Sequence, residues 1–340
     1  MTTEMPYVNE STTWDYDYSE DPPVSPPVQG CSEVGCVTLV LVYVLIFVLG
    51  VCGNTTVIWI AGFKMKKTVN TICYLSLAIS DLLFCSCLPF NIVNIVHKKW
   101  IFGLFMCKFA SFVMFVNMYS SIFLLVIISV DRCVSVAFPV WGQNNRTLKR
   151  VMIAVFLAWV ISIIISVPGL IVRDVIIAPI EQVLICVIRY DLLSNSHTAI
   201  VVNRLVFGFV LPIVIISLCY SVIIIKLQTN RMARSSKPFK VMTALIATFF
   251  ISWLPYHVFT LTEIKFKLQI VQQGLSASVA LASLNSCLNP FLYAFMGRDF
   301  KDKCWNFLSR IENAFDDEGK SGTSKRTSSS QVYSKHSTNV

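Results

Sequence analysis

The chain has 340 residues, of which 55% are hydrophobic and only 14% are charged. Soluble domains carry roughly a quarter charged residues, so this composition excludes an ordinary soluble fold and indicates that lipid covers much of the surface. The net charge of +9 does not predict nucleic-acid binding, because the first 35 residues hold seven acids and no lysine or arginine, and the bases lie mostly between and after the apolar runs.

The segment 1–36 is an acidic, proline-rich tail that we expect to lie outside the cell. It contains the sequon Asn9-Glu10-Ser11, which predicts a glycan on Asn9. Tyr16 and Tyr18 are flanked by acids and are candidates for sulfation. Such a tail suits a basic protein ligand, and a merely solvated, disordered segment is the alternative. No cleavable signal peptide is visible, so the first apolar run is expected to act as an uncleaved signal anchor.

Seven apolar runs are long enough to cross a bilayer, which requires about 20 helical residues. They cover residues 37–63, 71–96, 104–138, 150–172, 199–227, 239–264 and 270–296. We therefore predict an all-α membrane protein, with a seven-transmembrane helix bundle over residues 37–297. An odd number of spans places the two termini on opposite sides of the membrane.

Lysine and arginine gather after the odd-numbered spans, as in Lys64-Met65-Lys66-Lys67 after the first, and are scarcer after the even-numbered ones. Loops rich in these residues face the cytosol. We therefore expect a multi-pass protein of the plasma membrane, with an extracellular N-terminus and a cytosolic C-terminus.

Asp81 is a lone acid deep in the second run, and ionisable side chains in bilayer spans usually face the bundle interior. Asn117 and Ser121 share one face of the third span, and Asn285 and Asn289 share one face of the seventh. A carboxylate surrounded by such oxygen-bearing groups predicts a pocket for a sodium ion, a candidate allosteric cofactor. A satisfied interhelical hydrogen-bond network is the alternative.

The third span runs 25 residues from Cys107 to Arg132, or about 37 Å of helix, so its ends lie at opposite membrane surfaces. Cys107 at the outer end can pair with Cys186 in the long loop 173–198, because the extracellular compartment permits disulfides. Whether that loop holds a hairpin cannot be decided from its pattern. At the inner end, the neighbouring Asp131 can hold Arg132, and an ordinary snorkelling arginine is the alternative.

These motifs, in this order, resemble the rhodopsin-like (class A) family of G-protein-coupled receptors over residues 37 to 310. The carrying motifs are Gly53-Asn54, Leu77-Ala78-Ile79-Ser80-Asp81, Trp100-Ile101-Phe102-Gly103, Asp131-Arg132-Cys133, Trp159, Pro212 with Tyr220, Phe249 to Tyr256, and Asn289-Pro290-Phe291-Leu292-Tyr293. Cys133 stands where tyrosine is usual. Asn289 stands where aspartate is also common, which weakens the charge available to sodium.

The resemblance implies a ligand-driven switch. A ligand that enters from outside would press on Trp253, and the sixth helix would swing outward about Pro255. Tyr220 and Tyr293, the latter beside Asn289 and Pro290, would then rearrange around a freed Arg132 and open a crevice for a G protein.

Within the family the resemblance is to the chemoattractant branch, and there to the chemerin receptors. It is carried by Phe63 to Asn70, Asp131 to Arg146, Lys226-Leu227-Gln228, Lys237-Pro238-Phe239-Lys240, Pro255-Tyr256-His257 and Phe295 to Phe300. The implied function is a receptor for a chemerin-like peptide or protein that signals through inhibitory G proteins and is regulated by arrestin. Formyl-peptide receptors look similar in several segments, so a formyl-peptide, anaphylatoxin or arrestin-biased scavenging receptor is the alternative.

Two cations near the outer helix ends, Arg173 and Arg204, predict the ligand chemistry. Arg204 lies eight residues before Pro212, roughly 12 Å further up the fifth span, and a guanidinium there needs an anion. We expect it to receive the free C-terminal carboxylate of a peptide, a role that the resemblance supports. An internal salt bridge to Glu263 is the alternative.

Trp253 and Tyr256 are expected to line the rest of this pocket, and Glu263 near the outer end of the sixth span is a further candidate ligand-binding residue. Amine ligands are disfavoured, because residues 109–119 contain no acid. An enzyme is not expected, since no catalytic or metal-binding constellation converges, and a transporter would show paired repeats.

After the last span, residues 298–310 carry Phe300, Trp305, Phe307 and Leu308 among lysines and arginines, which predicts a short amphipathic helix on the inner leaflet. Residues 311–340 form a Ser/Thr-rich tail that we expect to be disordered. Its cluster of candidate phosphorylation sites, which would attract arrestin, comprises Ser324, Thr327, Ser328, Ser329 and Ser330.

Overall fold

The computed structural model describes residues 33–179, 182–189, 196–229, 237–266 and 268–296, together with residues 302, 305 and 309. Its α-helices are α1 (Glu33–Trp59), α2 (Val69–His97), α3 (Gly103–Ala137), α4 (Pro139–Asn145), α5 (Leu148–Ile171), α6 (Ser196–Leu205), α7 (Leu211–Thr229), α8 (Lys237–Lys265) and α9 (Gln269–Met296). Two π-helical turns, η1 (Ile60–Lys64) and η2 (Val206–Val210), and two strands, β1 (Arg173–Ile177) and β2 (Leu184–Ile188), complete the described elements.

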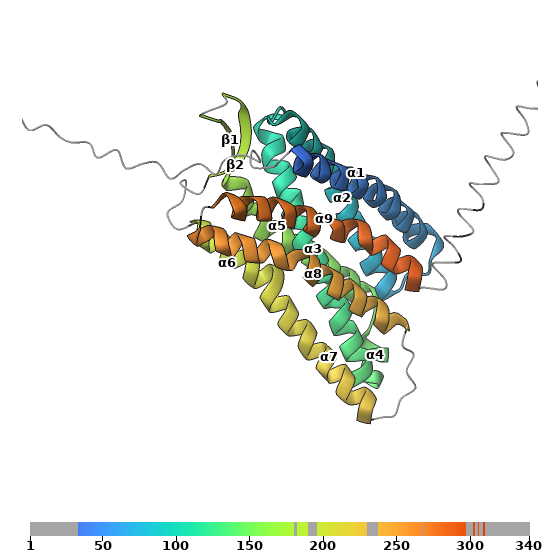
Figure 1. Ribbon diagram of the computed structural model, residues 1–340. Helices are drawn as coiled ribbons and strands as arrows, with labels where there is room; N and C mark the ends of the chain where they lie inside the picture. Colours follow the sequence, from blue (N-terminus) through green and yellow to red (C-terminus); the bar gives the residue numbers. More distant parts are fainter. Residues whose placement is uncertain are drawn as a thin grey trace, which may run out of the picture.

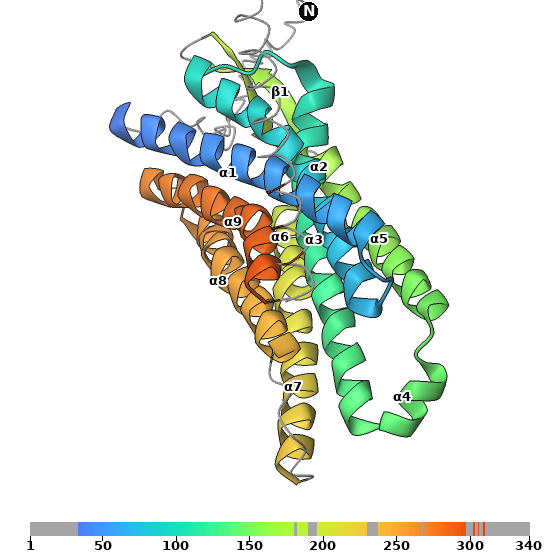
Figure 2. The same ribbon diagram turned by 90° about the vertical axis from the view of Figure 1, so that its right-hand side faces the viewer.

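Seven helical segments among the described residues are long and apolar enough to span a bilayer, which confirms the predicted fold class. They cover Val34–Lys64, Val69–His97, Gly103–Ala137, Leu148–Ile171, His197–Lys226, Lys240–Lys265 and Gln269–Tyr293, within a few residues of the predicted runs. The fifth segment combines α6, η2 and α7. Figures 1 and 2 show the long helices side by side, with β1 and β2 at one end of the bundle and α4 at the other.

We call these two ends the hairpin end and the α4 end. The outer helices carry large apolar side chains on their exposed faces, such as Leu41 and Leu45 on α1 and Phe156 and Ile164 on α5. Such faces would be unfavourable in water and are stable against lipid tails. In contrast, α3 lies at the centre of the bundle, where it packs against α2, α5, α7 and α8.

Each of five spanning segments contains one proline: Pro89, Pro168, Pro212, Pro255 and Pro290. Proline removes a backbone hydrogen bond and loosens the preceding turn. Just before Pro212 the backbone forms the π-helical turn η2, a distortion that is frequent at functional sites.

The long loop before α6 does contain a hairpin. β1 and β2 pair antiparallel, with Arg173 opposite Ile188 and Val175 opposite Cys186. The predicted disulfide is also present, between Cys107 at the start of α3 and Cys186 in β2. The hairpin is therefore fixed to the central helix at the mouth of the bundle.

The seam between α8 and α9 generates a stability prediction. A Cβ atom added to Gly274 of α9 would overlap three ring atoms of Phe259 on α8. We expect Gly274→Ala to destabilise the protein by about 1–3 kcal/mol, as overpacking usually does, and to lower its apparent melting temperature in detergent. Gly62→Ala is the matched control, because the nearest foreign atom, Leu75 Cδ1, would lie 3.9 Å from the added carbon. Equal melting of the two variants would contradict this packing.

Candidate functional site

Arg204 of α6 lies buried toward the hairpin end, with 6% of its surface exposed. Its guanidinium carbon lies 3.7 Å from the ring centroid of Phe115 on α3. Its Nη1 donates a hydrogen bond to the hydroxyl oxygen of Tyr256 on α8 at 3.2 Å. These contacts replace the alternative of a salt bridge between Arg204 and Glu263, which the structure does not form. Among the described residues, the partners of this cation are therefore neutral groups.

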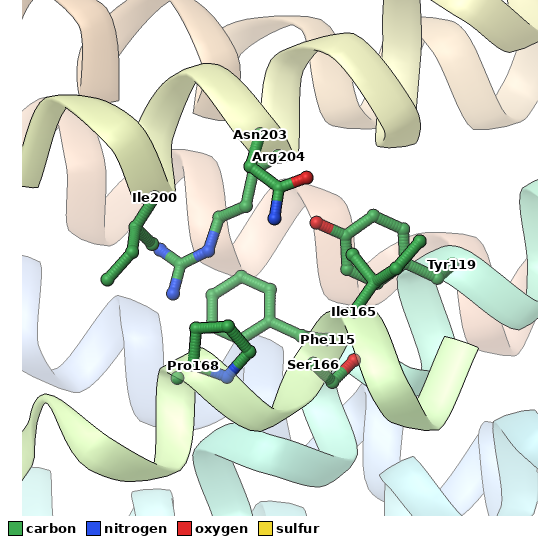
Figure 3. Close-up of a pocket in the computed structure, with 9 residues that line it drawn as sticks. Phe115, Tyr119, Ile165, Ser166, Pro168, Ile200, Asn203 and Arg204 are labelled. Carbon is green, nitrogen blue, oxygen red and sulfur yellow. The ribbon is translucent and has the colours of Figure 1, made fainter. Parts of the chain in front are cut away.

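A small, partly enclosed cavity adjoins this guanidinium, between α3, α5 and α6. Figure 3 shows the side chain of Arg204 reaching into it from α6. The lining residues are Phe115, Tyr119, Ile165, Ser166, Pro168, Gly169, Ile200, Asn203 and Arg204. Gly169 keeps α5 close, since a Cβ there would lie 3.6 Å from Nη2 of Arg204 and 3.7 Å from the ring of Phe115. The cavity thus combines one cation, a few neutral polar groups and apolar walls.

Trp253 and Tyr256, which the sequence predicts for the pocket, lie together on α8 but are not among the residues that line the cavity, although Tyr256 binds Arg204. Their ring centroids are 5.6 Å apart in an edge-on arrangement, and Trp253 also packs against Phe249 at 6.0 Å. Sequence reasoning missed the adjacent His257, whose two ring nitrogens are buried without a hydrogen-bond partner among the described residues. A polar residue directly after Tyr256 in a buried helix was the available signal.

The structure does not bring Arg173 to the cavity of Arg204. Arg173 begins β1 in the hairpin, and its Nη1 lies 4.0 Å from Sγ of the disulfide-bonded Cys186. The hairpin is further tied together by an ion pair of 3.2 Å between Arg189 and Asp174. The two arginines predicted to bind the ligand therefore lie in different parts of the protein, Arg173 in the hairpin and Arg204 within the helix bundle.

Asp81 lies at the centre of the bundle with none of its surface exposed. Its two carboxylate oxygens accept hydrogen bonds from the Nδ2 atoms of Asn117, at 2.9 Å, and Asn289, at 2.8 Å. Ser286, which sequence reasoning missed, donates to Asn117 Oδ1 at 3.2 Å and accepts from Asn54 at its carbonyl oxygen. The network thus joins α1, α2, α3 and α9.

The remaining predicted sodium ligands, Ser121 and Asn285, are buried as well, with 1% and 2% exposed. Ser121 Oγ and Asn285 Oδ1 have no hydrogen-bond partner among the described residues. A buried carboxylate with neutral partners, in the same bundle as unpartnered oxygens, has the chemistry of a site for a hard cation.

At the α4 end, the predicted contact between Asp131 and Arg132 is wrong. Arg132 donates from Nη2 to Asn70 Oδ1 on α2 at 2.5 Å. The carboxylate of Asp131 instead binds Arg146, which follows α4, through two hydrogen bonds of 2.5 and 2.6 Å. Successive residues point about 100° apart around a helix, so Arg132 faces α2 while Asp131 faces the returning chain.

The other predicted switch residues occupy separate positions. The hydroxyl of Tyr220 on α7 lies 3.2 Å from that of Thr243 on α8. Tyr293 is buried on α9, with its ring centroid 4.5 Å from that of Tyr74 on α2. Pro290 packs close to Gly53, where an added Cβ would lie 3.0 Å from the proline ring.

Several predicted sites lie outside the described residues. They are Asn9, Tyr16, Tyr18, Ser324, Thr327, Ser328, Ser329 and Ser330, together with most of the segment 298–310.

Comparison with known proteins places the chain among membrane receptors. The family described as "7 transmembrane receptor (rhodopsin family)" matches residues 53–293. Chemerin-like receptor 1 of Rattus norvegicus is 39% identical over 323 residues, which cover 89% of this chain and 86% of the relative. The C3a anaphylatoxin chemotactic receptor of Danio rerio is 40% identical over 309 residues, or 89% and 84% of the two chains. N-formyl peptide receptor 2 of Gorilla gorilla gorilla is 37% identical over 293 residues, or 80% and 84%.

Proposed function

The chain belongs to the rhodopsin family of seven-transmembrane receptors, as its motifs predict, and we propose that its ligand is a chemoattractant peptide or protein with a free C-terminal carboxylate. Its relatives are chemoattractant receptors rather than enzymes, and the family acts through G proteins. The observation that carries the ligand proposal is the buried guanidinium of Arg204, whose partners in the described part of the chain are neutral.

A buried arginine inside a bilayer span costs about 2.5–3.5 kcal/mol when nothing compensates its charge. A guanidinium offers five N–H donors, and the hydroxyl of Tyr256 accepts one of them. A carboxylate can accept two more in parallel and neutralise the charge. A cavity adjoins this guanidinium between α3, α5 and α6. Ligand binding would therefore relieve an electrostatic cost that the empty receptor carries.

We infer the class of ligand from the receptors to which the sequence is similar. The sequence is similar to chemerin-like receptors, so we propose a chemerin-like ligand, with C3a-type and formyl-peptide ligands as the competing candidates. The acidic tail 1–36 would attract the basic body of a protein ligand, with Tyr16 and Tyr18 sulfated and Asn9 glycosylated. Arg173 in the hairpin would meet the ligand on its way to Arg204.

The proposed orientation of the receptor in the membrane supports ligand entry at the hairpin end. Within the described residues, basic side chains gather at the α4 end, on Lys64, Lys66, Lys67, Arg146, Lys149, Arg150, Lys226 and Lys240. The hairpin end carries the disulfide. By the positive-inside rule the α4 end faces the cytosol, so the N-terminus is extracellular and the C-terminus cytosolic.

Signalling would proceed through inhibitory G proteins at the α4 end, with arrestin binding the phosphorylated tail. Arg132 of the coupling switch binds Asn70, and Asp131 binds Arg146, through contacts that can break when the helices move. These contacts favour G-protein coupling over an arrestin-biased scavenging role. The buried carboxylate of Asp81 supports an allosteric sodium ion there, with the neutral side chains of Asn117, Ser121, Asn285 and Asn289 around it.

The ligand proposal predicts the effect of removing the cation. In cells that express the receptor, chemerin, C3a and a formyl peptide are compared by calcium and cyclic-AMP responses. For the active ligand, Arg204→Ala should lower potency by about 10–100-fold, because hydrogen bonds to charged groups contribute about 1.5–3 kcal/mol. Arg189→Ala, which removes an ion pair in the hairpin and leaves the buried cation in place, is the matched control. Unchanged potency in Arg204→Ala would refute the carboxylate site, and silence toward all three ligands would refute the ligand class.

The cytosolic contact predicts a change in resting activity. Asn70→Ala removes the acceptor of Arg132 and should raise ligand-independent G-protein activation by up to about tenfold, the population shift for roughly 1.4 kcal/mol. Asn145→Ala is the control, since Asn145 accepts from Arg150 and leaves Arg132 untouched. Basal nucleotide exchange at equal surface expression is the measurement. If the two variants show the same exchange rate, Asn70 does not restrain the switch.

Sodium binding predicts a salt-specific stabilisation. Sodium chloride should raise the apparent melting temperature of the purified receptor above that in equimolar choline chloride, because a ligand that binds only the folded state stabilises it. Asp81→Asn removes the charge and should abolish the difference, whereas Ser121→Ala should reduce it. A sodium effect that persists in Asp81→Asn would exclude this site.

A further inference from the structure

Two free cysteine thiols meet where α3 packs against α7, toward the α4 end of the bundle. Cys133 lies four residues before Ala137, the last residue of α3. Cys219 lies on α7, seven residues before Lys226, at which the fifth spanning segment ends. Both are free cysteines, and their side chains are hydrogen-bonded to each other.

The contact follows from the sides that the two helices turn toward each other. On α7, Ile216, Cys219 and Ile223 are buried and recur every three or four residues, which places them on one side of the helix. On α3, Cys133 follows the buried Ile122 by eleven residues, or about three turns, and lies on the same side. Ile122 and Ile216 belong to one hydrophobic core, so these two sides face each other.

The spacing of packed helices suits a disulfide at this point. Packed helix axes lie about 8–10 Å apart and each Cα stands about 2.3 Å from its axis, so directly facing Cα atoms are roughly 3–5 Å apart. Disulfides join residues whose Cα atoms are about 4.4–6.8 Å apart. Because the two thiols already touch, Cys133 and Cys219 can be joined without a large movement of α3 or α7.

Cys133 is the member of the pair that a small oxidant reaches first. Its side chain is partly exposed at the α4 end, which we assign to the cytosol, whereas Cys219 is buried. Disulfides that form in the cytosol are usually transient and often sense redox state. By contrast, Cys85 and Cys287 are buried near Asp81 at the centre of the bundle.

The two thiols are flanked by two residues of the coupling switch. Arg132 precedes Cys133 and binds Asn70, and Tyr220 follows Cys219 with its hydroxyl against α8. In the switch that the family resemblance implies, Tyr220 rearranges around a freed Arg132, which requires α7 to move relative to α3. A covalent bond between the thiols would oppose this movement.

We propose that Cys133 and Cys219 form an oxidation-sensitive pair, whose disulfide fixes α3 to α7 and holds the receptor in the arrangement in which Asn70 binds Arg132. The oxidant is a peroxide from the cytosolic side. The effect on signalling rests on the proposed function, whereas formation of the disulfide does not.

The reaction has two steps. The Cys133 sulfur attacks one oxygen of hydrogen peroxide, the O–O bond breaks, and the thiol proton leaves with the departing hydroxide as water, which gives a sulfenic acid. The Cys219 sulfur then attacks the sulfenic sulfur, so that an S–S bond forms and the S–O bond breaks. The second hydroxide takes the Cys219 proton and leaves as water. The pair of thiols loses two electrons, and the peroxide gains them. Thiol–disulfide exchange with a cytosolic thiol restores both cysteines.

The chemical test uses the purified full-length receptor without ligand. After treatment with hydrogen peroxide, mass spectrometry of proteolytic fragments should find the segments of Cys133 and Cys219 joined, and dithiothreitol should separate them. Cys219→Ala should leave Cys133 as an unlinked sulfenic acid. Cys52→Ala is the matched control, because Cys52 is exposed on α1, and it should form the cross-link as the parent does. Oxidation of Cys133 in the parent receptor without any cross-link to Cys219 would overturn the inference.

The functional test measures nucleotide exchange on an inhibitory G protein, which is added after the peroxide has been removed. Oxidation should lower exchange about tenfold in the parent and in Cys52→Ala, both without ligand and with chemerin, because a cross-link that fits one arrangement shifts the population toward it. Dithiothreitol should restore the rate. Cys219→Ala and Cys133→Tyr, which introduces the residue usual at this position, should be insensitive to peroxide.

A cross-linked receptor that exchanges nucleotide at the full rate would also overturn the inference. Failure of the proposed function looks different. The reduced receptor would then respond to none of chemerin, C3a and the formyl peptide, while peroxide would still join Cys133 to Cys219 and lower the exchange measured without ligand.

Discussion

The hydrocarbon core of a bilayer solvates apolar side chains on any helix face but solvates no charge, and this constraint organises the whole molecule. It permits Leu41, Leu45 and Ile164 to stay exposed on the outer helices, where lipid covers them. It also requires that Asp81 and Arg204 lie inside the bundle, with 0% and 6% of their surface exposed. Each then depends on polar groups that other helices supply.

Helix α3 contributes to each of the polar sites along the bundle. Phe115 and Tyr119 contact or face Arg204 toward the hairpin, Asn117 donates to Asp81 in the middle, and Asp131 binds Arg146 at the α4 end. The disulfide at Cys107 fixes the hairpin to the first turn of the same helix. A small shift of α3 would therefore alter contacts at every level, which is the physical requirement for a signal that crosses the membrane.

The three levels differ in how their charges are compensated. Asp131 has a full counter-charge in Arg146, Asp81 has two neutral amide donors, and Arg204 has a phenol and an aromatic face. Neutral partners leave net charge in a medium of low dielectric constant, where an added ion gains the most. The uncompensated sites are therefore the ones that suit an exchangeable ligand, and the compensated one suits a structural contact.

The sequence alone determined the number of spans and their limits, because bilayer thickness dictates the length of each apolar run. The run predicted at 71–96, for example, is the helix Val69–His97. It also determined which ends of α3 meet water, and with them the Cys107–Cys186 disulfide. The family motifs were equally readable, since they are local patterns in a fixed order.

Only the tertiary structure decided which polar groups meet. Asp131 and Arg132 are adjacent in sequence, yet they face different helices and bind Arg146 and Asn70. Tyr119 has the spacing of any buried aromatic residue, and only the packed helices show that its hydroxyl has no hydrogen-bond partner among the described residues and lines a cavity. The direction of a side chain around its helix axis is useful only once the neighbouring helices are in place. Those neighbours are set by packing between segments that lie tens to hundreds of residues apart.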